Sequence, residues 1–405
     1  MLRVDAERFR ADFDALAAVG ATPAGGVSRP TFSDAHLNAR GWFFERARAA
    51  GLETRVDAAG NHSAVLRSAR ADAPTLLLGS HLDSVPDGGR FDGALGVVAA
   101  LEVLRTAKDA ELDLPVTLEA IDFTDEEGTL VGLLGSWAVA GMLPPETLRA
   151  PRGGRDALLA GLARAGLDEE RLADARRDPA SLAGYLELHI EQGPVLERDG
   201  VDVGVVSGIV GSRSFRLAFV GAPGHAGTTP MDARRDAGVA AAAFVVGARE
   251  LVVRVYPGCV ATVGSASFEP GAFNVIPGRA RLALEFRSLD AGQLDALERD
   301  LLELARSQGL DVDVEPVGRW EPTPLDESVR AAIARAADDL GLSTRELPSG
   351  AGHDAQALAT VTQSGMLFVP SRGGISHSPA ELTDWDDCVN GANVLLNAAL
   401  ELARR

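Results

Sequence analysis

Four short apolar segments, each followed by polar residues, constrain the fold of this chain more than any other feature. They are TLLLG (75–79), VTLEAIDF (116–123), GYLELHI (184–190) and GMLFVPS (365–371). Short apolar runs bounded by turn residues are typical of strands that are buried on both faces. Helical patterns separate these runs, so the sequence predicts an α/β fold with a mostly parallel sheet and helices on both faces.

The helices of this predicted α/β part lie at 4–18, 33–50, 93–107 and 384–404, and Thr383 is the expected N-cap of the last one. The pattern changes between about residues 207 and 323. There the strand-like segments 214–224 and 280–290 alternate apolar and polar residues, and the helical segments 234–255 and 291–309 each follow one of them. We therefore expect an inserted α+β domain at 208–322, with a four-stranded antiparallel sheet and two helices. The α/β domain then comprises residues 1–207 and 323–405.

Length and composition support this division and exclude some classes of partner. A chain of 405 residues exceeds what one hydrophobic core usually fills. The formal net charge of −19 argues against nucleic acid and anionic membranes as partners, because both bind basic surfaces. No apolar run reaches the roughly 20 residues that a membrane-spanning helix needs. The amphipathic N-terminus does not resemble a signal peptide, and the two cysteines, Cys259 and Cys388, fit a reducing cytoplasm as buried thiols.

Histidines and carboxylates follow the predicted strands. His81 comes two residues after the strand 75–79, at the carboxyl end where open α/β sheets bind ligands. Asp83 can hydrogen-bond the imidazole nitrogen that faces away from a metal, and Asp92 ends a glycine-rich loop at the start of a helix. Taken alone, Asp92 is equally well explained as a helix cap and His81 as a surface residue.

An acidic group follows the second strand, where the segment 116–123 delivers Asp125, Glu126 and Glu127. Adjacent glutamates point in different directions, so one can bind a metal while the other faces the substrate as a general base. An isolated acidic pair is more often a solvated loop. His189 ends the third strand and His377 lies in a Gly/Ser-rich loop after the fourth, where a surface histidine is the ordinary alternative.

Considered together, these residues predict a metal site, because the ends of parallel strands meet at one edge of a sheet. Three imidazoles and two carboxylates suit Zn²⁺, Mn²⁺, Co²⁺ or Ni²⁺. Five protein ligands exceed the three that hold a typical catalytic zinc ion, but they satisfy two ions about 3.5 Å apart when one carboxylate bridges them. The candidate ligands are His81, Asp92, Glu127, His189 and His377.

Several motifs, in this order, resemble those of the hydantoinase/carbamoylase amidases. They are GSHLDSVPDGGRFDGALG, FTDEEG, ELHIEQGPVLE, GHAGTTPMDARRDA, FNVIPG, SGAGHDAQ and VPSRGGISHSPAE. This family contains N-carbamoyl-L-amino-acid hydrolases, β-ureidopropionases and allantoate amidohydrolases, within the aminoacylase–carboxypeptidase clan of dinuclear metallohydrolases. The resemblance covers nearly the whole chain.

The resemblance implies roles for the candidate residues of the α/β domain. His81, Asp92 and His189 would hold one divalent transition-metal ion, and Asp92 would bridge to a second ion held by Glu127 and His377. Glu126 matches the general acid/base of the family. Asp83 matches the residue that orients His81 from behind.

The inserted domain resembles a lid and dimerisation domain, which implies a homodimer. His225, Asn274 and Arg287, together with Gln192, match positions that bind the ureido and carboxylate groups of a small-molecule substrate. Arg287 offers a planar fork for a carboxylate, and His225 and Asn274 can donate to an oxyanion. The structural alternatives are that Arg287 is a salt-bridged arginine on a strand and that His225 and Asn274 are turn residues. His353 is expected near the site, either as support or in contact with substrate; whether residues of the inserted domain serve their own or the partner's site stays open.

The expected activity is hydrolysis of N-carbamoyl-L-amino acids to amino acid, carbon dioxide and ammonia. GTTPM, SGAGHDAQ and IVGSR look more like the allantoate branch, whereas GSHLDSV, TDEEG and SHSPAE look more like the carbamoylases. A deacylase or peptidase of the same clan is a third reading. A non-catalytic binding protein would lack a ligand or Glu126, and none is missing. Family members often have Arg-Phe where this chain has Thr129-Leu130, and no ligand role explains Val85–Arg90.

Overall fold

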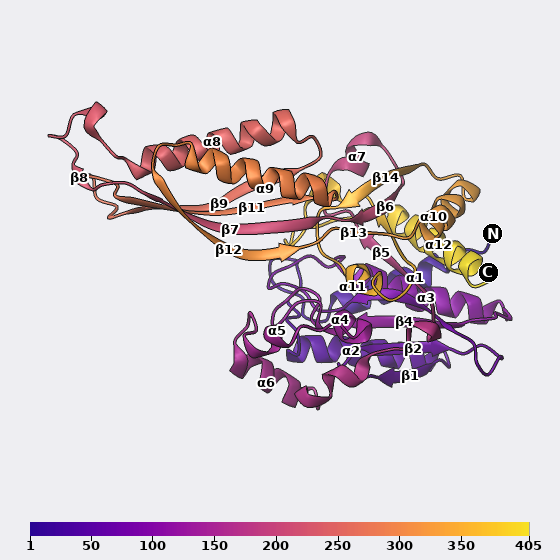
Figure 1. Ribbon diagram of the computed structural model, residues 1–405. Helices are drawn as coiled ribbons and strands as arrows, with labels where there is room; N and C mark the ends of the chain where they lie inside the picture. Colours follow the sequence, from indigo (N-terminus) through magenta and orange to yellow (C-terminus); the bar gives the residue numbers. More distant parts are fainter. Residues whose placement is uncertain (405) are drawn as a thin grey trace. The chain divides into compact units, whose positions relative to one another are not determined.

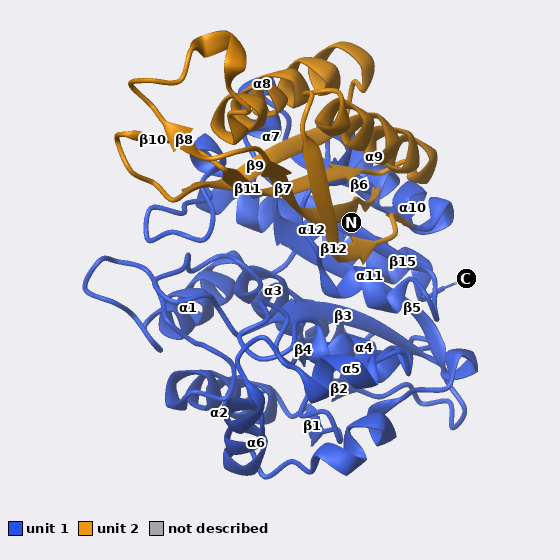
Figure 2. Ribbon diagram, turned by 60° about the vertical axis from the view of Figure 1, so that its left-hand side comes forward, with its two compact units in different colours: residues 1–207, 325–405 blue, residues 208–324 orange. Residues whose placement is uncertain are grey.

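The computed structural model describes residues 1–404 and divides into two compact units (Figure 2). Unit 1 comprises Met1–Ser207 and the residues from Leu325 onward, and unit 2 comprises Gly208–Pro324. The second boundary lies two residues beyond the expected one. Thr323 and Pro324 pair with Ile209 and Gly208, and this short antiparallel ladder keeps both residues in unit 2.

A nine-stranded mixed sheet organises unit 1 (Figure 1). Its strand order is β1-β2-β4-β3-β5-β15-β6-β13, and β14 also pairs with β6. The strands are β1 (Glu53–Val56), β2 (His62–Leu66), β3 (Thr75–His81), β4 (Thr117–Phe123), β5 (Leu182–Ile190), β6 (Val203–Ile209), β13 (Thr323–Pro324), β14 (Thr344–Ser349) and β15 (Ser364–Val369). Of these residues, Gly208 and Ile209 of β6 and both residues of β13 belong to unit 2. The four central strands, β4, β3, β5 and β15, run parallel. The predicted parallel sheet is therefore confirmed at its centre, and antiparallel strands extend it at both edges.

Helices cover both faces of the central strands. Leu186, Leu188 and Ile190 of β5 belong to the main core, which also contains residues of five helices. These helices are α1 (Ala6–Ala17), α2 (Asp34–Ala49), which also packs on β1 and β2, α3 (Ala94–Asp109), α10 (Glu327–Asp339) and α12 (Trp385–Leu402). The alternate residue Glu187 accepts a hydrogen bond from the Ala355 N–H of α11 (Asp354–Leu358), at 3.1 Å. Because side chains alternate along a strand, α11 lies on the opposite face.

The other helices of unit 1 lie outside this central layer. They are α4 (Leu134–Ala140), α5 (Pro145–Arg149), α6 (Arg155–Arg164) and α7 (Val195–Asp199). The predicted N-cap of the last helix is wrong by one residue: α12 begins at Trp385 and its N-cap is Asp384. The Thr383 hydroxyl is buried without a hydrogen-bond partner, so Thr383 does not cap the helix, and the Trp385 ring packs with its centroid 4.8 Å from that of Phe9.

Unit 2 is a four-stranded antiparallel sheet with two helices, as predicted. The strands are β7 (Gly211–Val220), β9 (Val260–Glu269), β11 (Arg279–Ser288) and β12 (Asp311–Trp320), in the order β12-β7-β11-β9. Helices α8 (Ala237–Val255) and α9 (Ala291–Arg306) bury Phe244, Leu294 and Leu301 against the sheet. A separate two-stranded ladder joins β8 (Gly224–His225) to β10 (Val275–Ile276). Over residues 1–404, no helix is long and apolar enough to cross a membrane.

A buried ion pair fixes the end of β4, from which the acidic loop departs. The Arg40 guanidinium donates to Asp122 at 2.7 Å, and both side chains are almost fully buried. The other carboxylate oxygen of Asp122 accepts the N–H of Leu82, the residue after His81, at 2.8 Å. Asp122 therefore ties the ends of β3 and β4 together.

The neighbouring His62 predicts a dependence of stability on pH. Its Nδ1 lies 2.9 Å from the Gly60 carbonyl oxygen, and its ring packs at a tilt against Phe44 with the ring centroids 4.7 Å apart. Burial, together with the nearby Arg40 cation, lowers the pKa of His62 from 6.5 to about 3. Below pH 6.5 the unfolded chain therefore binds a proton at His62 that the folded chain does not. The stabilisation is complete above pH 6.5 and is lost as the pH falls towards 3.

We expect this group alone to cost about 2 kcal/mol of folding stability between pH 6.5 and pH 5, at 1.36 kcal/mol per pH unit. In His62→Gln the amide keeps a donor for Gly60 but does not titrate. Urea unfolding of both proteins at pH 7.5 and pH 5, followed by far-UV circular dichroism, isolates the contribution, since all other groups titrate in both. An equal acid shift in the two proteins would contradict the prediction.

Candidate active site

Residues from four separate segments meet at the carboxyl edge of the parallel strands. His81 is the last residue of β3 and pairs with Phe123, the last residue of β4. On the other side of β3, His189 of β5 pairs with Phe368 of β15. The loops that leave these strand ends carry the acidic residues and His377. The parallel register thus brings to one edge the residues that the sequence pattern singled out.

Two groups of possible metal ligands share the Asp92 carboxylate. The first consists of His81, Asp92 and His189, and the second of Asp92, Glu127 and His377; within each group, ligand atoms lie within 4.8 Å of one another. Asp92 Oδ1 is 3.1 Å from His189 Nε2 and 3.6 Å from His81 Nε2. Asp92 Oδ2 is 3.3 Å from His377 Nε2, which is 3.4 Å from Glu127 Oε2. The structure therefore brings all five predicted ligands together.

Main-chain carbonyls orient the two buried imidazoles. His81 Nδ1 lies 3.0 Å from the Asp83 carbonyl oxygen, and His189 Nδ1 lies 2.9 Å from that of Ile190. A ring nitrogen that faces a carbonyl carries the proton, so Nε2 of each ring has the free lone pair. The Gly93 N–H, which donates to His189 Nε2 at 3.3 Å, agrees with this assignment. Both rings thus present a ligand nitrogen towards Asp92.

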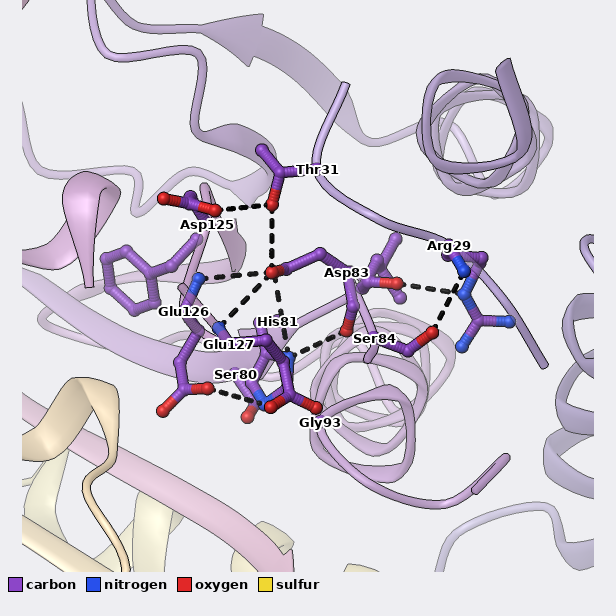
Figure 3. A network of polar contacts seen from close by, with 12 residues as sticks. Arg29, Thr31, Ser80, His81, Asp83, Ser84, Gly93, Asp125, Glu126 and Glu127 are labelled. Atoms are coloured by element: carbon purple, nitrogen blue, oxygen red, sulfur yellow. Dashed lines mark hydrogen bonds and ion pairs between the residues drawn. The ribbon is translucent and has the colours of Figure 1, made fainter. Parts of the chain in front are cut away.

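Asp83 orients His81 differently from the sequence expectation. The expected carboxylate–imidazole hydrogen bond is absent: Asp83 Oδ1 is 3.7 Å from His81 Nδ1, and the main-chain carbonyl takes the bond instead. The carboxylate accepts the N–H groups of Glu126 and Glu127 at 3.3 and 3.2 Å and the Thr31 hydroxyl at 3.0 Å (Figure 3). Asp83 therefore holds His81 with its backbone and the acidic loop with its side chain.

A left-handed residue turns the acidic loop towards both ligand groups. Asp125 has φ = 58°, and its carboxylate accepts the N–H groups of Leu130, Val131 and Gly132. This turn sends Glu126 and Glu127 in different directions, as their adjacency in the sequence predicts. Glu126 Oε2 is 3.5 Å from His81 Nε2, whereas Glu127 Oε2 reaches His377.

Gly93 allows the Asp92 loop to approach His81. Its φ is 62°, and a Cβ at this position would lie 2.4 Å from the imidazole ring. Both the left-handed backbone and the close contact require glycine here. Helix α3 starts at the next residue, so Asp92 enters the site directly from the N-terminal end of the helix.

Burial and the neighbouring imidazoles shift the pKa values of the carboxylates in the site in opposite directions. Burial, reinforced by the Asp92 carboxylate, raises the pKa of Glu127 to about 7. Burial also raises the pKa of Glu126 well above its ordinary value. Burial works against ionisation of Asp92 as well, but the surrounding imidazoles hold its pKa well below the ordinary value. The hydrogen bond to Asp92 raises the pKa of His377 to about 9.

These features fit divalent cations at the two groups. Glu127 Oε1 is buried and has no hydrogen-bond partner, so a carboxylate oxygen is left for another ligand. Two carboxylates, Asp92 and Glu127, face the same His377 imidazole, and cations bound there would neutralise their negative charges. The donors are nitrogen and oxygen without a thiolate, a set that suits Zn²⁺, Mn²⁺, Co²⁺ and Ni²⁺.

Two of the predicted substrate residues lie in unit 1. The side-chain amide of Gln192 donates to Asp92 Oδ2 at 2.7 Å, and Gln192 has a left-handed φ of 56°. His353 is buried, with its Nε2 2.8 Å from the Ser349 hydroxyl and its ring 4.5 Å from that of His189. Gln192 is therefore adjacent to the shared carboxylate, and His353 packs behind a candidate ligand.

The other three predicted substrate residues lie in unit 2. The β8–β10 ladder pairs His225 with Val275, and the Ala226 N–H donates to the Asn274 carbonyl at 2.9 Å, so His225 and Asn274 are neighbours. His225 Nδ1 accepts the Gly227 N–H at 3.1 Å, which leaves Nε2 as the protonated nitrogen. Arg287 lies on β11 and forms an ion pair with Glu285 at 2.7 Å, which is the structural alternative considered for it.

Sequence reasoning missed several residues that shape the site. The Thr31 hydroxyl comes from a loop 94 residues before Asp125; it lies 2.7 Å from the Asp125 carboxylate and 3.0 Å from that of Asp83, and it donates to one of them at a time. Ser376 contacts Asp92, and Glu381 accepts the Asp92 N–H. Both carboxylate oxygens of the buried Asp354 lack a hydrogen-bond partner. Only the SHSPAE and SGAGHDAQ motifs, which contain three of these residues, could have drawn attention to them; the chain carries no local signal for Thr31.

Comparisons with known proteins agree with this geometry. The model of peptidase family M20/M25/M40 matches residues 77–401. The N-carbamoyl-L-amino acid amidohydrolase of Geobacillus stearothermophilus is 40% identical over 395 residues, with 96% of each chain covered. The allantoate amidohydrolase of Bacillus subtilis is 34% identical, with 96% of this chain and 95% of the relative covered. A crystal structure of a hydantoinase/carbamoylase family amidase from Burkholderia multivorans matches with a TM-score of 0.91 and 35% identity, over 100% of this chain and 99% of that chain.

Proposed function

Since the chain belongs to peptidase family M20/M25/M40, we propose that it is a metal-dependent hydrolase that cleaves the ureido C–N bond of N-carbamoyl-L-amino acids. The products are the amino acid, carbon dioxide and ammonia. The observation that carries the proposal is the pair of ligand groups sharing Asp92, with the Glu126 carboxylate beside them. The relative at 40% identity bears the name of this activity.

Allantoate is the second candidate substrate. It also presents a ureido group and a carboxylate, and a relative at 34% identity is named for its hydrolysis. The lower identity of this relative makes it the less favoured candidate.

The proposed cofactor is a pair of divalent transition-metal ions. His81, Asp92 and His189 would hold one ion, and Asp92, Glu127 and His377 the other. When bound, such ions lower the pKa of a water molecule and polarise the carbonyl group of the substrate.

The chain's own residues move the proton and bind the substrate. Glu126 takes a proton from water and passes it to the leaving nitrogen, and its burial keeps bulk water from competing for that proton. Asp83 positions Glu126 through the Glu126 N–H. His225 Nε2 and Asn274 donate to the oxygen that becomes negative, and Arg287 and Gln192 bind the carboxylate and the ureido group. Substrate contact by His353 is the weaker of its two possible roles, because the side chain is buried.

We expect the chelator-treated chain to bind two divalent ions. His377→Ala should bind one, because the group of His81, Asp92 and His189 is left intact. Isothermal titration with Mn²⁺ and metal analysis after dialysis measure the stoichiometry, and His62→Gln, which belongs to neither ligand group, is the control that keeps two. Two tightly bound ions in His377→Ala would contradict the ligand assignment.

Glu126→Gln should retain both ions and lose about 10²- to 10⁴-fold in kcat, which is the usual contribution of a general acid/base. The amide keeps the shape of the side chain and cannot accept the proton. Steady-state ammonia release, together with metal analysis of the same sample, checks both halves of the prediction. Near-normal turnover with two ions present would remove Glu126 from this role.

The substrate class is tested by ammonia release from a panel of ureido acids with Mn²⁺, Co²⁺ or Zn²⁺ added. The panel contains N-carbamoyl-L-amino acids, their D enantiomers as matched controls, β-ureidopropionate and allantoate. We expect the highest kcat/KM with an N-carbamoyl-L-amino acid. A higher value for allantoate would establish the second candidate instead.

We also propose that the protein is a cytoplasmic homodimer joined through unit 2. Val239, Val246 and Val253 lie seven residues apart on α8, hence on one face, and are 62%, 59% and 71% exposed. The edge strand β9 contacts this helix and pairs on one side with β11. An apolar stripe beside an open strand edge suits a two-fold interface between copies. The two buried free thiols fit a reducing compartment.

Val246→Glu should therefore convert a dimer into a monomer in sedimentation-velocity experiments at micromolar concentration, because a charge placed in an apolar interface loses its hydration. Val56→Glu, at a 48% exposed valine of β1 in unit 1, is the matched control that leaves the dimer intact. Monomeric wild-type protein, or dimeric Val246→Glu, would contradict this interface.

A further inference from the structure

Glu381 is a buried carboxylate whose partners are all neutral. Its side chain is 3% exposed, although it lies on the same loop as the half-exposed His377. One oxygen accepts the N–H groups of Phe91 and Asp92 at 2.8 and 3.1 Å, and the other accepts the Ser376 hydroxyl at 2.9 Å. Burying a carboxylate beside a second one, here Asp92, is costly. The fold keeps Glu381 in place despite this cost.

These hydrogen bonds join two loops that lie almost 300 residues apart in sequence. The N–H groups of Phe91 and Asp92 belong to the loop that precedes α3. Ser376 comes directly before His377. Glu381 therefore links the loop of the shared ligand Asp92 to the loop of His377, whose Nε2 lies 3.3 Å from Asp92 Oδ2.

The His377 loop has little other regular structure to hold it. His377 has a left-handed φ of 52° and lies between a three-residue 3₁₀ turn, Arg372–Gly374, and the start of α12. The adjacent Ser376 hydroxyl is 2.9 Å from Glu381 and 3.1 Å from Asp92 Oδ2. A hydroxyl donates one hydrogen bond at a time, so Ser376 serves either carboxylate and in both cases stays between the two loops.

The segment Val85–Arg90 is shaped around this carboxyl group. A Cβ at Gly89 would lie 1.9 Å from the carboxyl carbon of Glu381. The neighbouring Gly88 is held from the other side by reciprocal backbone hydrogen bonds with Val27, at 2.9 and 3.0 Å. The segment Val85–Arg90, which no ligand role explains, thus packs around the carboxyl group of Glu381.

We propose that Glu381 is a positioning residue that sets the spacing between Asp92 and His377 as ligands of the second metal ion. The proposal rests on the two-ion site of the proposed function. Glu381 acts through the length of its side chain, because its carboxyl oxygens must extend to the Phe91 and Asp92 N–H groups on one side and to the Ser376 hydroxyl on the other.

Two conservative variants separate the effect of side-chain length at Glu381 from the effect of its charge. Glu381→Asp keeps the charge and shortens the side chain by one methylene, whereas Glu381→Gln keeps the length and an oxygen acceptor but removes the charge. In Mn²⁺ titrations of the chelator-treated full chain, we expect Glu381→Asp to weaken binding of the second ion by about 10- to 100-fold, the usual effect of losing an outer partner of a ligand. Glu381→Gln should lose less, and the first ion should be unchanged in both variants.

Asp326→Asn is the matched control. Asp326 also accepts two backbone N–H groups, those of Ser328 and Val329, and one serine hydroxyl, that of Ser328, but it caps α10 and contacts neither ligand loop. It should lower the thermal midpoint and still bind two ions as the wild type does. Visible absorption of the Co²⁺-loaded proteins reports the geometry of each ion without using turnover.

The outcomes are distinguishable. Wild-type protein that binds fewer than two ions contradicts the proposed two-ion site itself. If the wild-type protein binds two ions and Glu381→Asp binds them with the same affinities, the role of Glu381 is overturned. It is also overturned if Asp326→Asn weakens binding of the second ion as much as Glu381→Asp does. If far-UV circular dichroism shows that Glu381→Asp does not fold, Ser376→Ala removes the link from its other end, and unchanged affinity for the second ion in that variant overturns the inference.

Discussion

The Asp92 carboxylate, shared by three imidazoles, is the interaction on which the rest of the site depends. His81, His189 and His377 reach it from three different segments of the chain. A carboxylate at such a position cannot be displaced without separating both ligand groups. The sheet provides the first two histidines through strand register. Gly93, Gln192 and Glu381 also bear on where this carboxylate lies.

Residues that follow directly from strand geometry could be predicted from sequence. An apolar run that ends in a histidine places that histidine at the sheet edge, which holds for His81 and His189. The partner of His81 Nδ1 could not be predicted, because carbonyl and carboxylate of Asp83 are both two residues away. The choice between them depends on the Glu126 and Glu127 N–H groups, 43 and 44 residues further along the chain. Thr31 and Glu381 depend in the same way on contacts between distant loops.

The fold shows the same limit at its edges. Strands buried on both faces, such as β15, are visible as nearly continuous apolar runs. The short strand β1 and the edge strands β9 and β12 are largely exposed, so burial marks them only weakly: in β9 and β12, exposed and partly buried residues alternate over the first five positions. Their presence follows from hydrogen bonding to the neighbouring strands β2, β11 and β7, of which β7 and β11 lie in segments that the sequence predicted. The class and order of the domains and the four-stranded sheet of unit 2 could therefore be inferred, whereas the antiparallel strands at the edges of the unit 1 sheet could not.

The glycine-rich stretch before α3 carries a consequence for how such loops are interpreted. At Gly93 the missing side chain leaves room for the His81 ring, and at Gly89 it leaves room for the Glu381 carboxyl group. At Gly88 a Cβ would lie 2.9 Å from the side chain of Val85, within the same turn. Glycine is abundant in this loop because neighbouring groups occupy the space that side chains would need. The loop is closely packed around His81 and Glu381, so its glycines do not indicate flexibility.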